Sequence, residues 1–337
     1  MAAAAACVLT LTATGCDSVI YDSQDNCAYY VRFRYDYNMK FADAFHSEVK
    51  QVTLYVFDSQ GKYVKTLTEP IEEIIARGNM MEITDEELQP GNYRFLAWAA
   101  CNNGFRHFQV GEGTDIDDFS CRLDRDETAA PAERDADCGR LYHGLTDNVS
   151  LSETYGDIID MDLTKDTNVI HVALQQMSGE PMNPEEFEFR IVDTNGWMAH
   201  DNSLLPDNPI HYKPWSVKSA QVGDADFGRA DAGITTVSGM VADFTVSRLI
   251  PEHGQSARLI VTDTRDGEEV VNLPLIDVLL LVRGNYTNPV NDRPVSDREF
   301  LDREDDYELI FFLENRRWAG ASIYINSWHV VLQNAGV

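Results

Sequence analysis

The chain of 337 residues is poor in basic side chains, because 27 Lys and Arg stand against 56 Asp and Glu and give a net charge of −29. Proteins that bind nucleic acid present a basic face that releases counterions from the phosphates. No cluster of Lys and Arg of this kind occurs in the sequence, which argues against nucleic acid as a partner. The acidic excess is typical of a solvated surface whose like charges repel one another.

The apolar stretch at the N-terminus is too short to cross a bilayer, since a spanning helix needs about 20 apolar residues and acidic residues follow from Asp17. Its length suits the apolar region of a signal peptide, although no Lys or Arg precedes it. Ala13-Thr14-Gly15 places small residues before Cys16, which predicts cleavage there and a lipid on the Cys16 thiol. Residues 1–15 are then a lipoprotein signal peptide and residues 16–26 a polar tether. The alternative is an ordinary secretory signal cut near the same point.

Sequence motifs of known catalytic and metal sites are missing. There is no Gly-x-Ser-x-Gly, His-Glu-x-x-His, phosphate-binding glycine loop or Cys-x-x-Cys. The eight histidines are scattered singly, and we interpret His171 and His329, which lie in predicted strands, as structural. Acidic stretches at residues 115–118 and 263–267 do not follow the calcium-loop pattern. We therefore predict no enzymatic activity, no cofactor and no metal.

Cysteine is scarce, with six residues in all, and Cys7 leaves with the predicted signal. Export permits disulfides, so the four cysteines that remain after lipidation of Cys16 are disulfide candidates: Cys27, Cys101, Cys121 and Cys138. Cys121 with Cys138 is the local pair, and Cys27 with Cys101 is the remainder. The alternative is that some of these thiols stay free and buried.

The length and the strand pattern predict two domains divided near Thr164. In the first, residues 29–37 alternate between apolar and mostly charged side chains, residues 52–57 and 63–67 form a hairpin around Gly61, and residues 93–100 form a central strand. Residues 38–47 predict a helical turn, and residues 158–163 predict the closing strand. Residues 102–140 show no regular pattern and include a strongly acidic stretch, residues 112–137, to which the sequence assigns no order or role.

The second part of the chain again reads as short strands. They are predicted at residues 168–174, 187–192, 239–247, 259–262, 270–273, 307–313 and 321–332. Residues 274–281 predict one buried helix with Pro274 in its first turn. Short strands at this spacing predict an all-β protein of two β-sandwiches in series, with domains at residues 27–163 and 164–337 and a few short helices.

Several of these segments together resemble the fimbrial anchor lipoproteins of Bacteroidales, the membrane-proximal subunits of type V pili. The matching residues are Cys16-Asp17-Ser18, Tyr21-Asp22, Cys27, Phe33 to Met39, Ala42-Asp43-Ala44-Phe45, Leu54 to Asp58, Gly61, Pro90 to Tyr93, Ala97-Trp98-Ala99 and Ile323 to Trp328. The resemblance is good over residues 16–101 and looser beyond them.

This resemblance implies two transthyretin-like Greek-key sandwiches, an outer-membrane lipid anchor exposed on the cell surface, and a non-catalytic protein at the fimbrium base that holds the stalk and limits its length. The stalk subunit is the implied partner, and the family's polymerising relatives join by strand complementation. Ser322 to Val337 is the expected contact. An internal strand over Ile323 to Val331 is the alternative, which leaves as interface candidates Leu332, Gln333, Asn334, Ala335, Gly336 and Val337.

A second hypothesis is a surface lipoprotein that binds glycan or a host ligand through exposed aromatic side chains. Trp98, Trp197 and Trp215 are the tryptophans considered for such a stacking platform. Trp98 lies in the middle of a predicted strand and is expected in the core. Trp197 and Trp215 fall in irregular sequence and are expected to be exposed.

Overall fold

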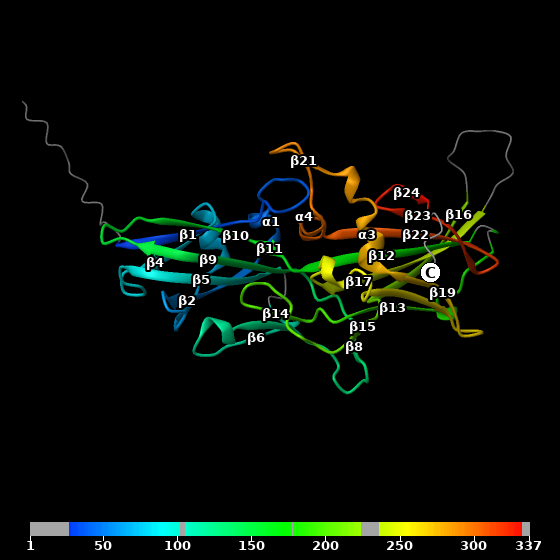
Figure 1. Cartoon of the computed structure of the whole chain (residues 1–337), viewed down its shortest axis with the longest axis horizontal. Coiled ribbons are helices and arrows are strands. Elements are labelled where there is room, and N and C mark those ends of the chain that lie inside the picture. Colours follow the sequence, from blue (N-terminus) through cyan, green and yellow to red (C-terminus); the bar gives the residue numbers. More distant parts are fainter. Residues whose placement is uncertain (1–26, 102–104, 177, 179, 224–235, 332–337) are drawn as a thin grey trace, which may run out of the picture.

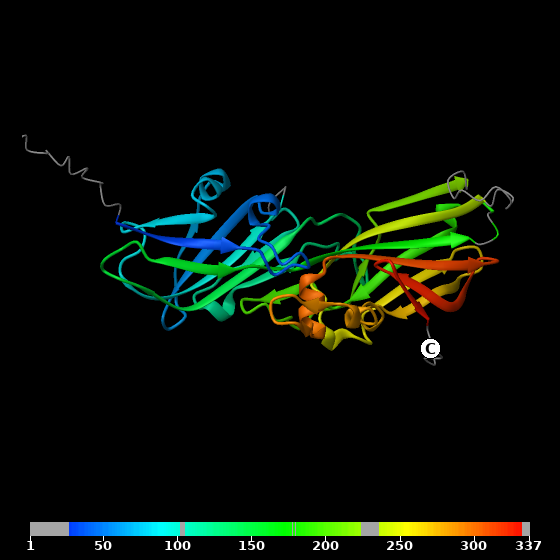
Figure 2. The ribbon, with the colours of Figure 1, turned by 90° about the horizontal axis from the view of Figure 1, so that it is seen from above.

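A computed structural model describes residues 27–101, 105–176, 178, 180–223 and 236–331. Within these residues the chain is mostly β-strand with a few short helices, which confirms the predicted class. Two pairs of large sheets lie end to end along the long axis, and the first strand, β1 (Ala28–Arg34), begins at one end of the molecule (Figures 1 and 2). We call the pair that contains β1 the N-terminal half and the other pair the C-terminal half.

The N-terminal half encloses its core between a three-stranded and a five-stranded sheet. The three-stranded sheet has the order β10 (Ile158–Asp162), β1, β4 (Met80–Thr84). The other has the order β11 (Thr164–Lys165), β9 (Leu141–Leu151), β5 (Gly91–Ala100), β2 (Gln51–Asp58), β3 (Tyr63–Thr68). Two short helices flank them, α1 (Phe45–Glu48) and α2 (Ile71–Ala76).

Alternation in the sequence explains how β1 packs. Tyr29, Val31 and Phe33 are fully buried, whereas Arg32 and Arg34 point to the outer face and form ion pairs with carboxylates of β10. The predicted hairpin of β2 and β3 is also confirmed, with Gly61 at a φ of 81° in its turn. β5 is a central strand, as predicted.

The C-terminal half encloses its core between a six-stranded and a five-stranded sheet. The six-stranded sheet has the order β16 (Ser216–Gly223), β17 (Thr236–Ser247), β12 (Thr167–Gln176), β22 (Asp306–Glu314), β23 (Arg317–Ile325), β24 (Trp328–Val331). The five-stranded sheet has the order β19 (Glu268–Pro274), β18 (Arg258–Asp263), β13 (Phe187–Asp193), β15 (Ile210–Tyr212), β8 (Ala132–Arg134). Also present are β20 (Thr287–Asn288), β21 (Arg293–Pro294), α3 (Leu275–Leu280) and α4 (Asp297–Arg303).

The prediction of an irregular stretch at residues 102–140 is wrong over its described part. It contains β6 (Phe108–Gly111), β7 (Ser120–Leu123) and β8. β7 pairs with β6 and with β14 (Trp197–Ala199), and β8 joins the sheet of the C-terminal half through β15. These strands are only three to four residues long, and β7 and β8 also pair with strands far away in the sequence, so local alternation does not predict them.

Because of this stretch, one of the two hydrophobic clusters extends across both halves, while the inner core of the N-terminal half with Val31 and Phe33 is a separate cluster. Phe119 lies with its ring 5.3 Å from that of Tyr55 on β2, and Tyr55 also contacts Trp98 on β5. These buried residues belong to the same cluster as Phe189 and Leu309 of the C-terminal half. The outer face of the five-stranded sheet of the N-terminal half is thereby covered by strands that lead into the C-terminal half.

Two further sequence predictions differ from the structure, and one is confirmed. The helical turn expected over residues 38–47 is limited to α1. The strand expected over residues 321–332 is broken into β23 and β24 by a turn in which Asn326 and Ser327 have positive φ. The buried helix predicted at residues 274–281 is present as α3, preceded by Pro274.

Candidate functional site: the two ends and the junction

The predicted lipidation site lies outside the described residues, as do the signal peptide of residues 1–15 and the tether of residues 16–26. The first described residue, Cys27, lies next to β1 at one end of the long axis (Figure 1). A lipid on Cys16 would therefore pull on the molecule from this end.

The four disulfide candidates lie at different places. Cys27 is exposed, whereas Cys121 on β7 and Cys138 are buried free thiols. Cys101 is half-buried, and its Sγ accepts a hydrogen bond from the backbone N–H of Arg140 at 3.0 Å. Burial raises the pKa of Cys138 to about 12. Cys121 and Cys138 are separate free thiols in the structure, and the pairing of the four cysteines stays a prediction.

The interface candidates Leu332 to Val337 also lie outside the described residues, but the strand before them is described. β24 is the edge strand of the six-stranded sheet and pairs with β23. Trp328 is 45% exposed and Val331 is 58% exposed. An edge strand with exposed apolar side chains presents unpaired backbone groups to a strand of another chain.

The sequence left two roles open for the segment from Ser322 to Val331: a contact with the stalk subunit or an internal strand. In the structure the segment is divided between β23 and β24. Ile323 and Ile325 of β23 are fully buried and paired on both sides, so this part is internal. β24 is the part left at the edge. Next to it a row of rings crosses three strands, since the Tyr324 ring lies 5.7 Å from that of Phe312 and 4.9 Å from that of His329.

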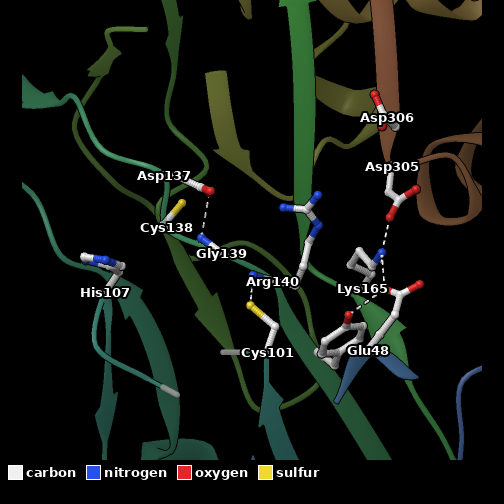
Figure 3. A pocket seen from close by; sticks show the side chains of 11 residues that line it. Glu48, Cys101, His107, Asp137, Cys138, Gly139, Arg140, Lys165, Asp305 and Asp306 are labelled. Carbon is white, nitrogen blue, oxygen red and sulfur yellow. Dashed lines mark hydrogen bonds and ion pairs between the residues drawn. The ribbon is translucent and has the colours of Figure 1, made fainter. Parts of the chain in front are cut away.

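A polar pocket of about 520 Å³ lies at the junction of the two halves (Figure 3). Its central cation is Lys165 of β11, whose side chain is 3% exposed. The Lys165 Nζ lies 2.8 Å from Glu48 Oε2 in the N-terminal half and also forms an ion pair with Asp305, which precedes β22 in the C-terminal half. It lies 5.1 Å from the ring centre of Tyr35 and 5.6 Å from that of Tyr142. Lys165 therefore joins both halves by charge.

The charge of Glu48 follows from these neighbours. Burial favours its neutral form, but the ammonium of Lys165 and the hydroxyl of Tyr142, which donates to Glu48 Oε2 at 2.8 Å, together hold the pKa of Glu48 below its ordinary value. Glu304, next to the pocket, lacks such a cation. Burial and the neighbouring Asp305 raise the pKa of Glu304 to about 7.

A second ionic group lies deeper in the junction. Arg248 donates to Asp302 Oδ1 through Nε at 3.0 Å and through Nη2 at 2.8 Å, and its Nε lies 3.9 Å from Asp166 Oδ1. Asn202 donates to Asp166 Oδ1 at 2.9 Å. Asp166 is fully buried, and this burial raises its pKa to about 7. These contacts fix the geometry of the junction.

The acidic clusters weighed in the sequence have protein partners. Asp115 pairs with Lys62, and Asp263 pairs with Arg316. Within the described ranges, no group of three His, Cys, Asp or Glu side chains is placed to hold a metal ion. In the same ranges, no helix has both the length and the apolar character needed to cross a membrane.

The tryptophans of the second hypothesis do not form one platform. Trp98 is fully buried, as expected. Trp197 on β14 is half-buried, and the guanidinium of Arg122 lies 5.5 Å from its ring centre. Trp215 is 38% exposed and stands before β16.

Sequence reasoning missed the junction residues, because Lys165 and Asp305 are 140 positions apart and neither belongs to a motif. One signal was available nearby. Ser296-Asp297-Arg298-Glu299 has the Ser-x-x-Glu spacing of a helix start, and Ser296 Oγ does accept the N–H of Glu299 at 3.1 Å at the beginning of α4.

Comparison with known proteins adds a family to this geometry. The model of a family described as fimbrillin-A associated anchor proteins Mfa1 and Mfa2 matches residues 23–334. No curated protein matches the chain significantly.

Solved structures are similar over almost the whole chain. A candidate adhesin from Bacteroides thetaiotaomicron is 34% identical, with 90% of this chain and 97% of that chain covered and a TM-score of 0.76. A candidate polysaccharide-binding protein from the same organism is 29% identical, with 91% and 99% covered and a TM-score of 0.74. The fimbrial anchor protein Mfa2 from Porphyromonas gingivalis is 20% identical, with 91% and 99% covered and a TM-score of 0.62, which shows a shared fold.

Proposed function

Since the chain belongs to the family of fimbrillin-A associated anchor proteins Mfa1 and Mfa2, we propose that it attaches a fimbrial stalk to the outer membrane through a lipid on Cys16 and limits the length of the fimbria. The observation that carries this proposal is the elongated shape, with the predicted lipid at one end and an exposed edge strand in the other half (Figure 1). The protein acts without catalysis, at the cell surface and at the base of the fimbrium.

For the lipid, two or three acyl chains hold a protein far more firmly than one, at about 0.8 kcal/mol for each buried methylene. The anchor therefore withstands the drag on a fimbria where a single chain gives only reversible binding. The polar residues between Cys16 and Cys27 keep the folded part clear of the membrane.

For the stalk, the contact is made by β24 together with Leu332 to Val337. An incoming strand of the stalk subunit pairs with the free backbone edge of β24, while its side chains contact Trp328 and Val331. This is strand complementation, and main-chain hydrogen bonds supply the affinity.

For the domain organisation, we infer a signal peptide of residues 1–15, a tether of residues 16–26, and two transthyretin-like Greek-key sandwiches at residues 27–163 and 164–337. The passage from β11 to β12 supports the division, because these consecutive strands belong to sheets of different halves. β8 lies in the sheet of the C-terminal half, so the first domain reaches into the second.

Replacement of Cys16 by Ala tests the anchor directly. We expect the protein and its fimbriae to leave the membrane fraction and appear in the medium, while Cys27→Ala, the matched control at an exposed thiol, leaves both on the cell. Electron microscopy of a deletion strain measures attachment and length separately. Fimbriae that stay attached and normal in length without the gene would contradict the proposal.

Variants at the edge strand test the partner contact. We expect Trp328→Lys with Val331→Lys, or removal of residues 332–337, to weaken binding of the purified stalk subunit at least about tenfold, since a few central residues carry most of an interface's energy. Val290→Lys is the matched control, because Val290 is exposed and apolar but lies in the hairpin of β20 and β21. Equal binding by the edge variants and the control would exclude β24 as the contact.

A second candidate function is the binding of glycan or a host ligand. It is supported by the similarity to the candidate polysaccharide-binding protein and by the exposed ring of Trp215. Titration with surface polysaccharides, compared between the parent and Trp215→Ala, tests it. No loss of binding in the variant would exclude this tryptophan.

A further inference from the structure

β1 is paired on both sides over Tyr30 to Arg32, and each of its other residues is paired on one side. It forms five residue pairs with β10, which runs parallel, and five with β4, which runs antiparallel. Its inner face is buried, and Arg32 and Arg34 on its outer face form ion pairs with β10. β1 runs from the end next to Cys27 toward the junction along the long axis (Figure 2). Tension applied at Cys27 therefore acts along the strand.

The chain after β1 is folded into a rigid turn at the junction. The Asn38 side chain, which is buried, donates to the carbonyl oxygens of Tyr35 at 2.9 Å and Ala42 at 2.8 Å. Asp43 Oδ1 accepts the N–H groups of Tyr35 at 2.9 Å and Phe45 at 3.0 Å. Because of these hydrogen bonds, the segment between β1 and the turn cannot lengthen under tension without breaking them.

Arg303, at the end of α4 in the C-terminal half, contacts this turn through both its face and its edge. Its guanidinium lies 4.1 Å from the ring centre of Tyr37 and 4.2 Å from that of Phe41. Its Nη1 donates to the carbonyl oxygens of Asp36 at 3.3 Å and Asn38 at 3.2 Å. We call this group of contacts the Arg303 clamp. A planar guanidinium can stack on rings and donate at its edge at the same time, which Lys cannot do.

Beyond the clamp the chain leads directly into β22. β22 begins at Asp306, three positions after Arg303, and is flanked by β12 and β23. It runs from the junction toward the far end along the long axis, in line with β1 (Figures 1 and 2).

We propose that β1, the Arg303 clamp and β22 form a tension-bearing path, so that the protein carries the load of a fimbria along strands loaded in shear. This inference rests on the proposed anchor function. When strands are pulled along their axes, all ladder hydrogen bonds resist together, because these bonds lie across the direction of the force. When neighbouring strand ends are pulled apart, the bonds break one pair at a time.

Single-molecule force spectroscopy compares the two directions in the full chain, with Cys7, Cys16 and Cys101 replaced by Ser. Cys27 is the first handle. Glu314→Cys at the far end of β22 is the second handle for the axial pull. Glu153→Cys is the second handle for peeling, since it lies in the turn before β10, where the N–H of Gly156 donates to the carbonyl of Ala28. We expect the axial rupture force to be at least about twice the peeling force at the same loading rate.

Substitution of Arg303 tests the clamp. We expect Arg303→Ala and Arg303→Lys to lower the axial rupture force by about a third or more and to leave the peeling force unchanged. Arg298→Ala on the same helix is the matched control, because Arg298 is exposed and pairs with Glu252 within the C-terminal half. Circular dichroism without force selects the variants that are folded, and Arg303→Lys retains the charge if Arg303→Ala does not fold.

Equal axial and peeling forces, or an axial force insensitive to Arg303, would overturn the proposal. Neither result depends on fimbriae, so a chain that fails here can still release fimbriae when Cys16 is replaced. A failure of the path and a failure of the anchor function are thus distinguishable.

Discussion

Replacement of Lys165 by Met tests whether charge joins the two halves. The change removes an ammonium that is 3% exposed and leaves Glu48 and Asp305 without it. Removing one partner of a fully buried ion pair costs about 3–5 kcal/mol. Here the carboxylates are 36% and 27% exposed, so water screens them and reduces the electrostatic cost to about 1–2 kcal/mol. Loss of the two cation–π contacts adds about 1 kcal/mol.

We therefore expect Lys165→Met to lower the free energy of unfolding by about 2–3 kcal/mol in total. Unfolding in urea, followed by tryptophan fluorescence and far-UV circular dichroism, measures this loss. Lys213→Met is the matched control. Lys213 pairs with Glu133 at 2.7 Å, but both side chains are more than a third exposed. We therefore expect this change to lower the free energy of unfolding by less than about 0.5 kcal/mol. A double-mutant cycle with Glu48→Gln isolates the pair. A loss in Lys165→Met no larger than that in Lys213→Met would refute the reasoning.

Further predictions concern protonation, thiols and packing. Because the pKa of Glu304 is raised from 4.5 to about 7, the folded chain binds this proton more tightly than the unfolded chain, and stability falls as the pH rises through this window. Glu304→Gln should therefore remove about 2 kcal/mol of the fall between about pH 5 and pH 8 in urea titrations, and an unchanged fall would contradict this. Cys27 should react with a thiol reagent in the native state, and Cys121 and Cys138 only after unfolding, as followed by mass spectrometry; a disulfide between the latter two would support the pairing predicted from the sequence instead. Trp98→Ala should cost about 3–5 kcal/mol in the free energy of unfolding, since the side chain is fully buried, and a loss under about 1 kcal/mol would place it outside the core.

Elements stabilised by local patterns could be predicted from the sequence. β1 alternates, β2 and β3 meet at Gly61, and Pro274 precedes α3, so each carries its own signal. The helical turn over residues 38–47 was overextended because Asn38 and Asp43 use their side chains to bind backbone groups that a helix would pair internally.

Elements that depend on distant partners could not be predicted. β7 and β8 are short, and each pairs with a strand more than fifty positions further along the chain. The same holds for the junction, where Lys165, Arg248 and Arg303 are single basic residues whose importance comes only from the carboxylates and rings that the fold brings to them. The exposed edge at β24 required knowledge of the strand order, since a sequence does not reveal which strand is outermost.

The core shared by the two halves has a consequence for biogenesis. A chain made from its N-terminus onward can pair β2, β5 and β9 early, but the apolar cluster around Trp98 and Tyr55 is completed only when Met198 and the strands beyond it have followed. Until then an incomplete chain leaves this face open to solvent. The first half thus cannot complete its packing from its own sequence alone, because part of the cluster that covers it is contributed by residues synthesised after its last strand.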